Sequence, residues 1–98
     1  MKYIGIWEMA SKDMDVNLKK YQELLTAREK GSDKFPKKTL SDNYVFTGQY
    51  KGFILYDDNT TEEQLVNVAL HFKDTMKWKF KPITEASKTI ELYMKSKK

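Results

Sequence analysis

The order of strand-like and helix-like segments is the feature that most constrains the fold of this chain. Side chains that are apolar at every second position indicate a strand, whereas apolar side chains spaced by three and four residues indicate a helix. These patterns follow one another as strand, helix, strand, strand, helix, strand over residues 2–9, 11–30, 44–47, 53–56, 65–76 and 77–83. The βαββαβ order predicts an α+β, ferredoxin-like fold, in which a four-stranded antiparallel sheet carries two helices on one face.

The first strand is apolar on both of its faces. Alternation places Tyr3 and Trp7 on one side of the sheet and Ile4 and Ile6 on the other, and residues 53–56 are similarly apolar. Two helices on one face cannot cover both sets, and each large apolar side chain left in water forfeits about 1.5–3 kcal/mol. We therefore expect a homodimer formed through the open sheet face.

Local signals mark the ends of the helices. Ser11 and Asp13 are candidate N-caps of the first helix, because their side-chain oxygens can accept hydrogen bonds from free amides. Thr60, with Glu63 three residues later, has the spacing of a capping box before the second helix. Residues 86–95 predict a short third helix, which is the one segment left to cover the open sheet face.

The first helix carries its apolar side chains on one stripe. Met14, Leu18, Tyr21 and Leu25 recur at four- and three-residue intervals and so share one helical face, and Leu24 widens this stripe. Gly31 suits the left-handed position that follows the last residue of a helix.

Glycine and proline constrain the remaining strands. Gly52 is expected to supply the positive φ of the turn or bulge between two hairpin arms, residues 44–47 and 53–56. Pro82 either confines the last strand to an edge of the sheet or marks the end of that strand, since it has no amide to donate. Residues 31–39 form a loop longer than usual, which could line a ligand site.

Length and composition favour one small domain over residues 1–98, with a frayed tail at 95–98. A hydrophobic content of 40% is sufficient for a packed core. The chain has no cysteine, so it can form neither disulfides nor thiolate metal sites. No apolar run approaches the roughly 20 residues of a membrane span, and no leader peptide is visible, so we expect a cytoplasmic protein without membrane contact.

The positive charge of the chain is spread out and comes from lysine. The net charge is +4, and Arg28 is the only arginine, whereas readers of nucleic acid depend on arginine for bidentate contacts. Lys51 to Phe53 reads K-G-F, a fragment of the aromatic motif of RNA-recognition folds without the rest of it. Nucleic-acid binding is therefore kept only as a weak alternative.

No arrangement of residues indicates catalytic chemistry, a metal site or a cofactor. His71 is the only histidine, lies off the apolar stripe of its helix, and has no recognisable partner. Aromatic side chains suggest instead a ligand pocket between sheet and helices, with ordinary core packing as the alternative explanation. The candidate pocket residues are Tyr3, Trp7, Phe46, His71 and Trp78.

Three stretches resemble a family of small proteins known only as a domain of unknown function. They are M-K-Y-I at residues 1–4, G-Q-Y-K-G-F-I-L at 48–55 and F-K-D-T-M-K-W-K-F-K-P-I at 72–83. Phe72 stands where that family more often has an indole, and Thr75 where it has leucine. The resemblance implies a ferredoxin-like fold related to dimeric α+β barrels, and it implies no activity.

Three functions fit these features. The first is a self-associating module that binds a small molecule or serves a structural role. The second is an enzyme similar to the cofactor-independent monooxygenases found on dimeric α+β barrels, an analogy of fold alone. The third is a nucleic-acid-binding module that uses lysines and sheet aromatics.

Overall fold

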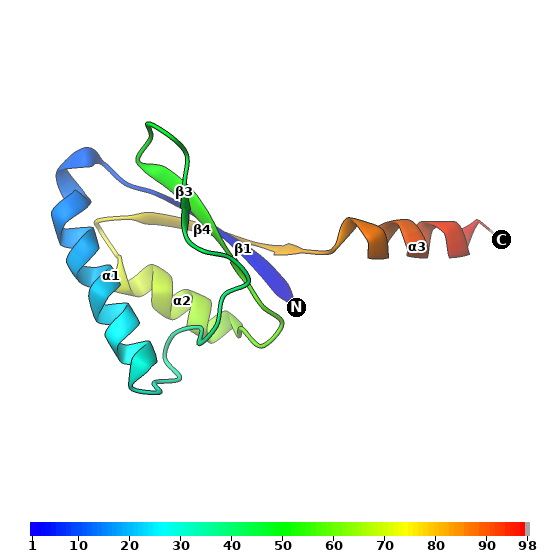
Figure 1. Ribbon diagram of the computed structural model, residues 1–98, viewed down its shortest axis with the longest axis horizontal. Helices are drawn as coiled ribbons and strands as arrows, with labels where there is room; N and C mark the ends of the chain where they lie inside the picture. Colours follow the sequence, from blue (N-terminus) through cyan, green and yellow to red (C-terminus); the bar gives the residue numbers. More distant parts are fainter. Residues whose placement is uncertain (98) are drawn as a thin grey trace.

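The computed structural model of the protein describes residues 1–97 and confirms the predicted order of strands and helices (Figure 1). In chain order the elements are β1 (Lys2–Glu8), the 3-10 turn η1 (Ser11–Asp13), α1 (Met14–Glu29), β2 (Tyr44–Val45), β3 (Lys51–Tyr56), α2 (Glu62–His71), β4 (Lys77–Ile83) and α3 (Ala86–Ser96). The strands form one antiparallel sheet in the order β2-β3-β1-β4, which is the ferredoxin-like arrangement. Helices α1 and α2 lie on the same face of this sheet.

The strand register separates two faces as the alternation of β1 predicts. Trp7 lies opposite Gly52 of β3 and opposite Trp78 of β4, on the face that the helices cover. Ile4 and Ile6 point to the other side, which we call the open face. The prediction that β1 is central and β4 an edge strand is thereby confirmed.

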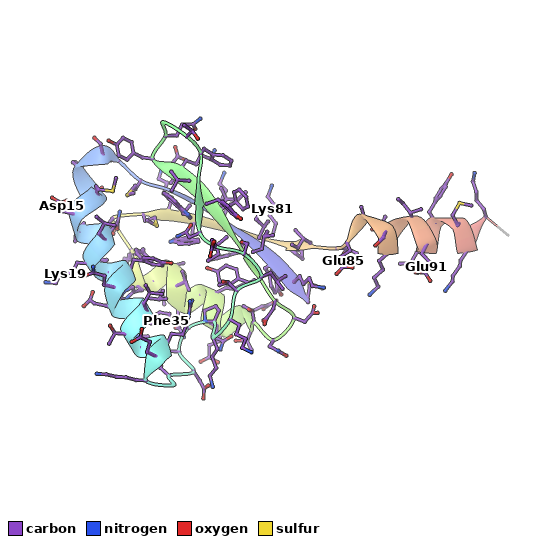
Figure 2. The ribbon with its side chains drawn as sticks, viewed as in Figure 1. Asp15, Lys19, Phe35, Lys81, Glu85 and Glu91 are labelled. Carbon is purple, nitrogen blue, oxygen red and sulfur yellow. The ribbon has the colours of Figure 1, made fainter. Side chains whose placement is uncertain are left out.

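The core lies between the helices and the sheet in two adjoining clusters. The first cluster contains Leu24, Phe35, Val68 and Phe72, and the second contains Ile54, Tyr56 and Leu65. Phe35 comes from the segment predicted as an open loop, yet it is only 4% exposed and lies beneath α1 (Figure 2). The loop is therefore fastened to the core at this residue.

The start of α1 differs from the prediction, whereas its end agrees. Asp13 occupies the N-cap position, but its side chain makes no capping hydrogen bond, and the 3-10 turn η1 leads into the helix instead. At the other end Gly31 has a φ of 82°, its amide donates to Arg28, and the amide of Ser32 donates to Ala27. These two bonds form a Schellman motif.

The capping box of α2 lies one residue later than predicted. The amide of Gln64 donates to the hydroxyl of Thr61, and the amide of Thr61 donates to Gln64 Oε1. Thr60 is buried, with its hydroxyl 3.4 Å from Asp57 Oδ1 in the preceding turn, so the Thr60–Glu63 prediction is wrong. Neighbouring threonines offer the same capping chemistry, and tertiary packing decides between them.

The hairpin turn is made by a different glycine from the one predicted. Phe46 accepts a hydrogen bond from the amide of Gln49, and Gly48 between them has a φ of 77°. Gly52 lies within β3, where a β-carbon would lie 2.5 Å from the Trp7 ring and closer still to the carbonyl oxygen of Tyr44. Gly52 is thus required for close packing rather than for a turn.

Helix α3 extends away from the rest of the molecule (Figure 1). It runs through Ser96, one residue past its predicted end and into the predicted frayed tail, whose last residue, 98, lies outside the described residues. Residues 84–97 are all exposed, and the radius of gyration is 15.7 Å, against about 13 Å for a compact chain of this length. The expectation that α3 could cover its own open face is therefore not met.

Candidate ligand-binding site

A cavity of about 400 Å³ lies between α1, the hairpin and the helix-covered face of the sheet. This volume is within the range of about 300–1,000 Å³ that is typical of small-molecule sites. We call it the Asn17–Trp78 cavity; its apolar and aromatic lining comes from Trp7, Met9, Met14, Leu18, Tyr21, Val45, Tyr50, Phe72, Met76 and Trp78.

Asn17 is the buried polar residue of this cavity. It lies on α1, is only 2% exposed, and donates from Nδ2 to the carbonyl oxygen of Thr75 at 2.8 Å and to the sulfur of Met9 at 3.1 Å. These contacts fix the orientation of the amide. Its Oδ1 is buried and has no hydrogen-bond partner among residues 1–97.

The loop between α2 and β4 supplies the carbonyl group that orients Asn17. Asp74 in this loop has a φ of 71°, a left-handed conformation that aspartate tolerates better than most residues. The reversal lets the amides of Thr75 and Met76 donate to the carbonyl oxygen of Phe72. Thr75 then faces α1 and Met76 enters the cavity lining.

Two tryptophans line the cavity, but their indole groups differ. Trp7 donates from Nε1 to Asn43 Oδ1 at 2.7 Å. The Nε1 of Trp78 is buried and lacks a partner within the described part of the chain. The Trp78 ring is held by Phe80, whose ring stacks on it at 5.4 Å, and by Phe72 at 5.9 Å.

Two residues that line the same cavity therefore each carry a buried polar atom without a partner among residues 1–97, an acceptor on Asn17 and a donor on Trp78. Leaving a buried polar atom without a hydrogen bond costs about 1–3 kcal/mol, and such atoms are rare in folded proteins. A small molecule that donates to Asn17 and accepts from Trp78 would satisfy both. A hydroxyl, a primary or secondary amide or a neutral carboxylic acid has both capacities.

The cavity carries no formal charge. Its lining contains asparagine, glutamine and tyrosine as polar residues, and no lysine, arginine, aspartate, glutamate or histidine. Because an unpaired ion is expensive to transfer into such surroundings, the site suits an uncharged molecule.

A second, more polar hollow of about 560 Å³ adjoins this cavity and shares Met9 and Met76 with it. Glu8, Asp13, Asp74 and Lys77 contribute its charged groups. Among the described residues, no three acidic or histidine side chains are grouped so that they could hold a metal ion.

Of the five residues predicted to form a pocket, the structure brings together Trp7 and Trp78. Tyr3 packs against the Ile54 cluster, away from the cavity. Phe46 lies with its ring 5.8 Å from Phe53, a residue of the open face.

His71 belongs to the contact between the two helices. Its Nε2 lies 2.7 Å from the carbonyl oxygen of Lys20 on α1, and its ring meets Phe35 and Phe72 edge to face at 5.3 and 5.2 Å. The structure therefore gives His71 a packing role, outside the Asn17–Trp78 cavity.

Asn17 is the residue of the site that sequence reasoning missed. The predicted stripe of α1 includes Leu24, which is buried, and Leu18, which is 53% exposed, whereas the other buried position is Asn17. Asn17, Tyr21 and Leu24 are spaced by four and three residues, so the same periodicity fits this set. The sequence signal for this site was therefore a polar residue, Asn17, at a helical position that faces the core.

The fold and the cavity define a ferredoxin-like α+β domain with a partly open apolar site. The chain belongs to the family described as Domain of unknown function (DUF3303), whose sequence pattern matches residues 1–97. No curated protein matches the chain. Across residues 1–97, none of the helices has both the length and the apolar character needed to cross a membrane.

Proposed function

We propose that this protein is a binding module for an uncharged, amphipathic small molecule, which occupies the Asn17–Trp78 cavity. The observation that carries the proposal is the pair of buried, unpartnered polar atoms of opposite type, Asn17 Oδ1 and Trp78 Nε1, on residues that line one cavity. The aromatic and thioether lining would contact the apolar body of the ligand, and the two polar atoms would orient its polar group.

Binding is better supported than catalysis. The polar side chains of the lining are asparagine, glutamine and tyrosine, and the lining includes no histidine, carboxylate or lysine that could act as a general acid or base. The cavity supplies shape, stacking surface and two oriented hydrogen-bonding atoms. The enzyme hypothesis finds no support in these residues, and the lysines of β4 lie outside the cavity lining.

The proposal can be tested with Nile red, an uncharged, environment-sensitive dye, and with native mass spectrometry of the protein purified without added ligand. Both tryptophans line the cavity, so dye binding should change their fluorescence. Asn17→Leu removes the buried acceptor at similar volume and Trp78→Phe removes the buried donor. Each should weaken retention of any co-purified molecule by about 5- to 150-fold, since a lost hydrogen bond with an unpaired partner costs about 1–3 kcal/mol.

Asn67→Leu is the matched control, because Asn67 donates to the carbonyl oxygen of Lys34 at 2.9 Å and does not line this cavity. Equal retention of a co-purified molecule by the wild type and by all three variants would contradict the proposal. So would tryptophan fluorescence that does not respond to saturating dye.

A further inference from the structure

Helix α3 has an apolar stripe that none of the described residues, 1–97, covers. Ala86, Ile90, Tyr93 and Met94 are spaced so that they share one side of the helix, and Leu92 lies on the opposite side. Ile90 is 60% exposed and Tyr93 is 57% exposed. An amphipathic helix normally buries such a stripe against a core.

The junction with β4 directs α3 away from its own domain. Only Thr84 and Glu85 separate the two elements, and Glu85 is extended, with a φ of −60° and a ψ of 133°. Its carboxylate accepts a hydrogen bond from the ammonium of Lys2 at 2.7 Å, a contact that lowers the pKa of Glu85 (Figure 2). Helix α3 consequently continues outward from β4.

The open face of the sheet is the second surface without a partner. Ile4 and Ile6 of β1 lie beside Leu55 and Phe53 of β3, and Tyr44 of β2 stacks on Phe53 at 5.4 Å. On the other side of β1, the lysines of β4 border this apolar strip, with Lys81 opposite Ile4 and Lys79 opposite Ile6. Apolar patches with a polar rim are typical of interfaces.

The surface area indicates how much is left uncovered. The chain exposes 7228 Å², whereas a compact monomer of 11.6 kDa exposes about 5,800 Å². The excess, about 1,400 Å², exceeds the roughly 800 Å² per partner of a standard interface and is typical of permanent homodimers.

The length of α3 is close to the width of the four-stranded sheet. Eleven helical residues span about 16 Å, and the outer strands of a four-stranded sheet lie about 14 Å apart. We propose that two copies of the chain exchange their α3 helices, so that the Ile90 stripe of each lies across the open face of the other. If a two-fold axis relates the two chains, each chain contributes its α3 stripe and its open face once, and no surface is left over to add a third chain.

The test is sedimentation analysis of the full chain with single substitutions. Wild type should have twice the 11.6 kDa mass at micromolar concentration. Ile90→Glu should raise the dimer dissociation constant at least about 100-fold, because a charge would enter an apolar contact in both copies. Leu92→Glu, the same kind of change on the opposite side of α3, should leave the constant within about threefold. Neither variant can unfold the domain, since α3 is exposed along its length.

Cross-linking then identifies the surface that α3 contacts. Since the native chain has no cysteine, Ile6→Cys and Ile90→Cys chains can be mixed and treated with a short bismaleimide. Linkage between unlike chains supports the exchange. The proposed exchange of α3 helices is contradicted if the wild type is monomeric, even if that monomer uses α3 or the open face to bind RNA or anionic vesicles. It is equally overturned by a dimer that Ile90→Glu does not weaken, or by Ile90→Cys chains that link only to one another.

Discussion

Gly52 is the position where one added methyl group should do most damage. In β3 its Cα faces the Trp7 ring, and a β-carbon would lie 2.5 Å from one ring atom, 2.7 Å from another and closer still to the carbonyl oxygen of Tyr44. The oxygen belongs to the backbone of β2, so it cannot move without opening the β2–β3 pairing. Because β2 has only two residues, we expect this pairing to be lost.

The magnitude follows from overpacking, which costs about 1–3 kcal/mol in a well-packed core. Gly52→Ala should lie at the upper end, about 3 kcal/mol, because a ring and a backbone group must both move. For a domain of this size that lowers Tm by about 12–24 °C. Thermal unfolding followed by circular dichroism measures the shift.

Gly48→Ala is the matched control. Gly48 has a φ of 77° and open space around it, so its alanine variant should lose only about 1–2 kcal/mol, the cost of a left-handed alanine. The reasoning is refuted if Gly52→Ala is no less stable than Gly48→Ala. It is also refuted if Gly52→Ala unfolds within a few degrees of the wild type.

Two further predictions concern the helix-covered side of the sheet. Burial raises the pKa of the Tyr56 phenol well above its ordinary value of 10.0, so the folded state keeps this proton while the unfolded state loses it. The free energy of unfolding should therefore fall once the pH exceeds about 10, and Tyr56 alone should contribute up to about 1.4 kcal/mol per pH unit to this fall. In denaturant titrations between about pH 9 and 11, the Tyr56→Phe variant should show a smaller dependence of the unfolding free energy on pH. Thr61→Ala removes the side-chain cap of α2 and should cost about 1 kcal/mol. Glu63→Ala should be close to neutral in the same urea unfolding assay, and a larger loss for Glu63→Ala than for Thr61→Ala would support the Thr60–Glu63 box instead.

The periodic parts of this fold could be predicted from sequence because repeated side-chain patterns have only a few structural solutions. The alternation of β1 gave the two faces correctly, and Gly31 marked the end of α1, since few residues other than glycine adopt a φ of 82° easily. The hairpin glycine was misplaced because both Gly48 and Gly52 are compatible with a turn. Only the packing of Trp7 on Gly52 distinguishes them.

The candidate site was less predictable for a similar reason. Trp7 and Trp78 could be named because both are large aromatic side chains on predicted strands, and the strand register of the structure places them side by side. Asn17 could not, because its importance depends on Thr75, 58 residues away in sequence, which takes up the amide and leaves the carbonyl oxygen without a partner. His71 was the most conspicuous residue by chemistry, yet its contacts are those of a packed ring.

The shortness of β2 has a consequence for access to the interior. One wall of the Asn17–Trp78 cavity, formed by Val45, Gln49 and Tyr50, belongs to a hairpin whose outer strand, β2, has only two residues. The Val45 arm is paired to β3 at two positions only, so it should open more readily than the three long strands, and a ligand that packs against Val45 would hold it closed. Ligand binding should then slow hydrogen exchange at the backbone amides of Phe46 and Gln49, which donate hydrogen bonds within this hairpin.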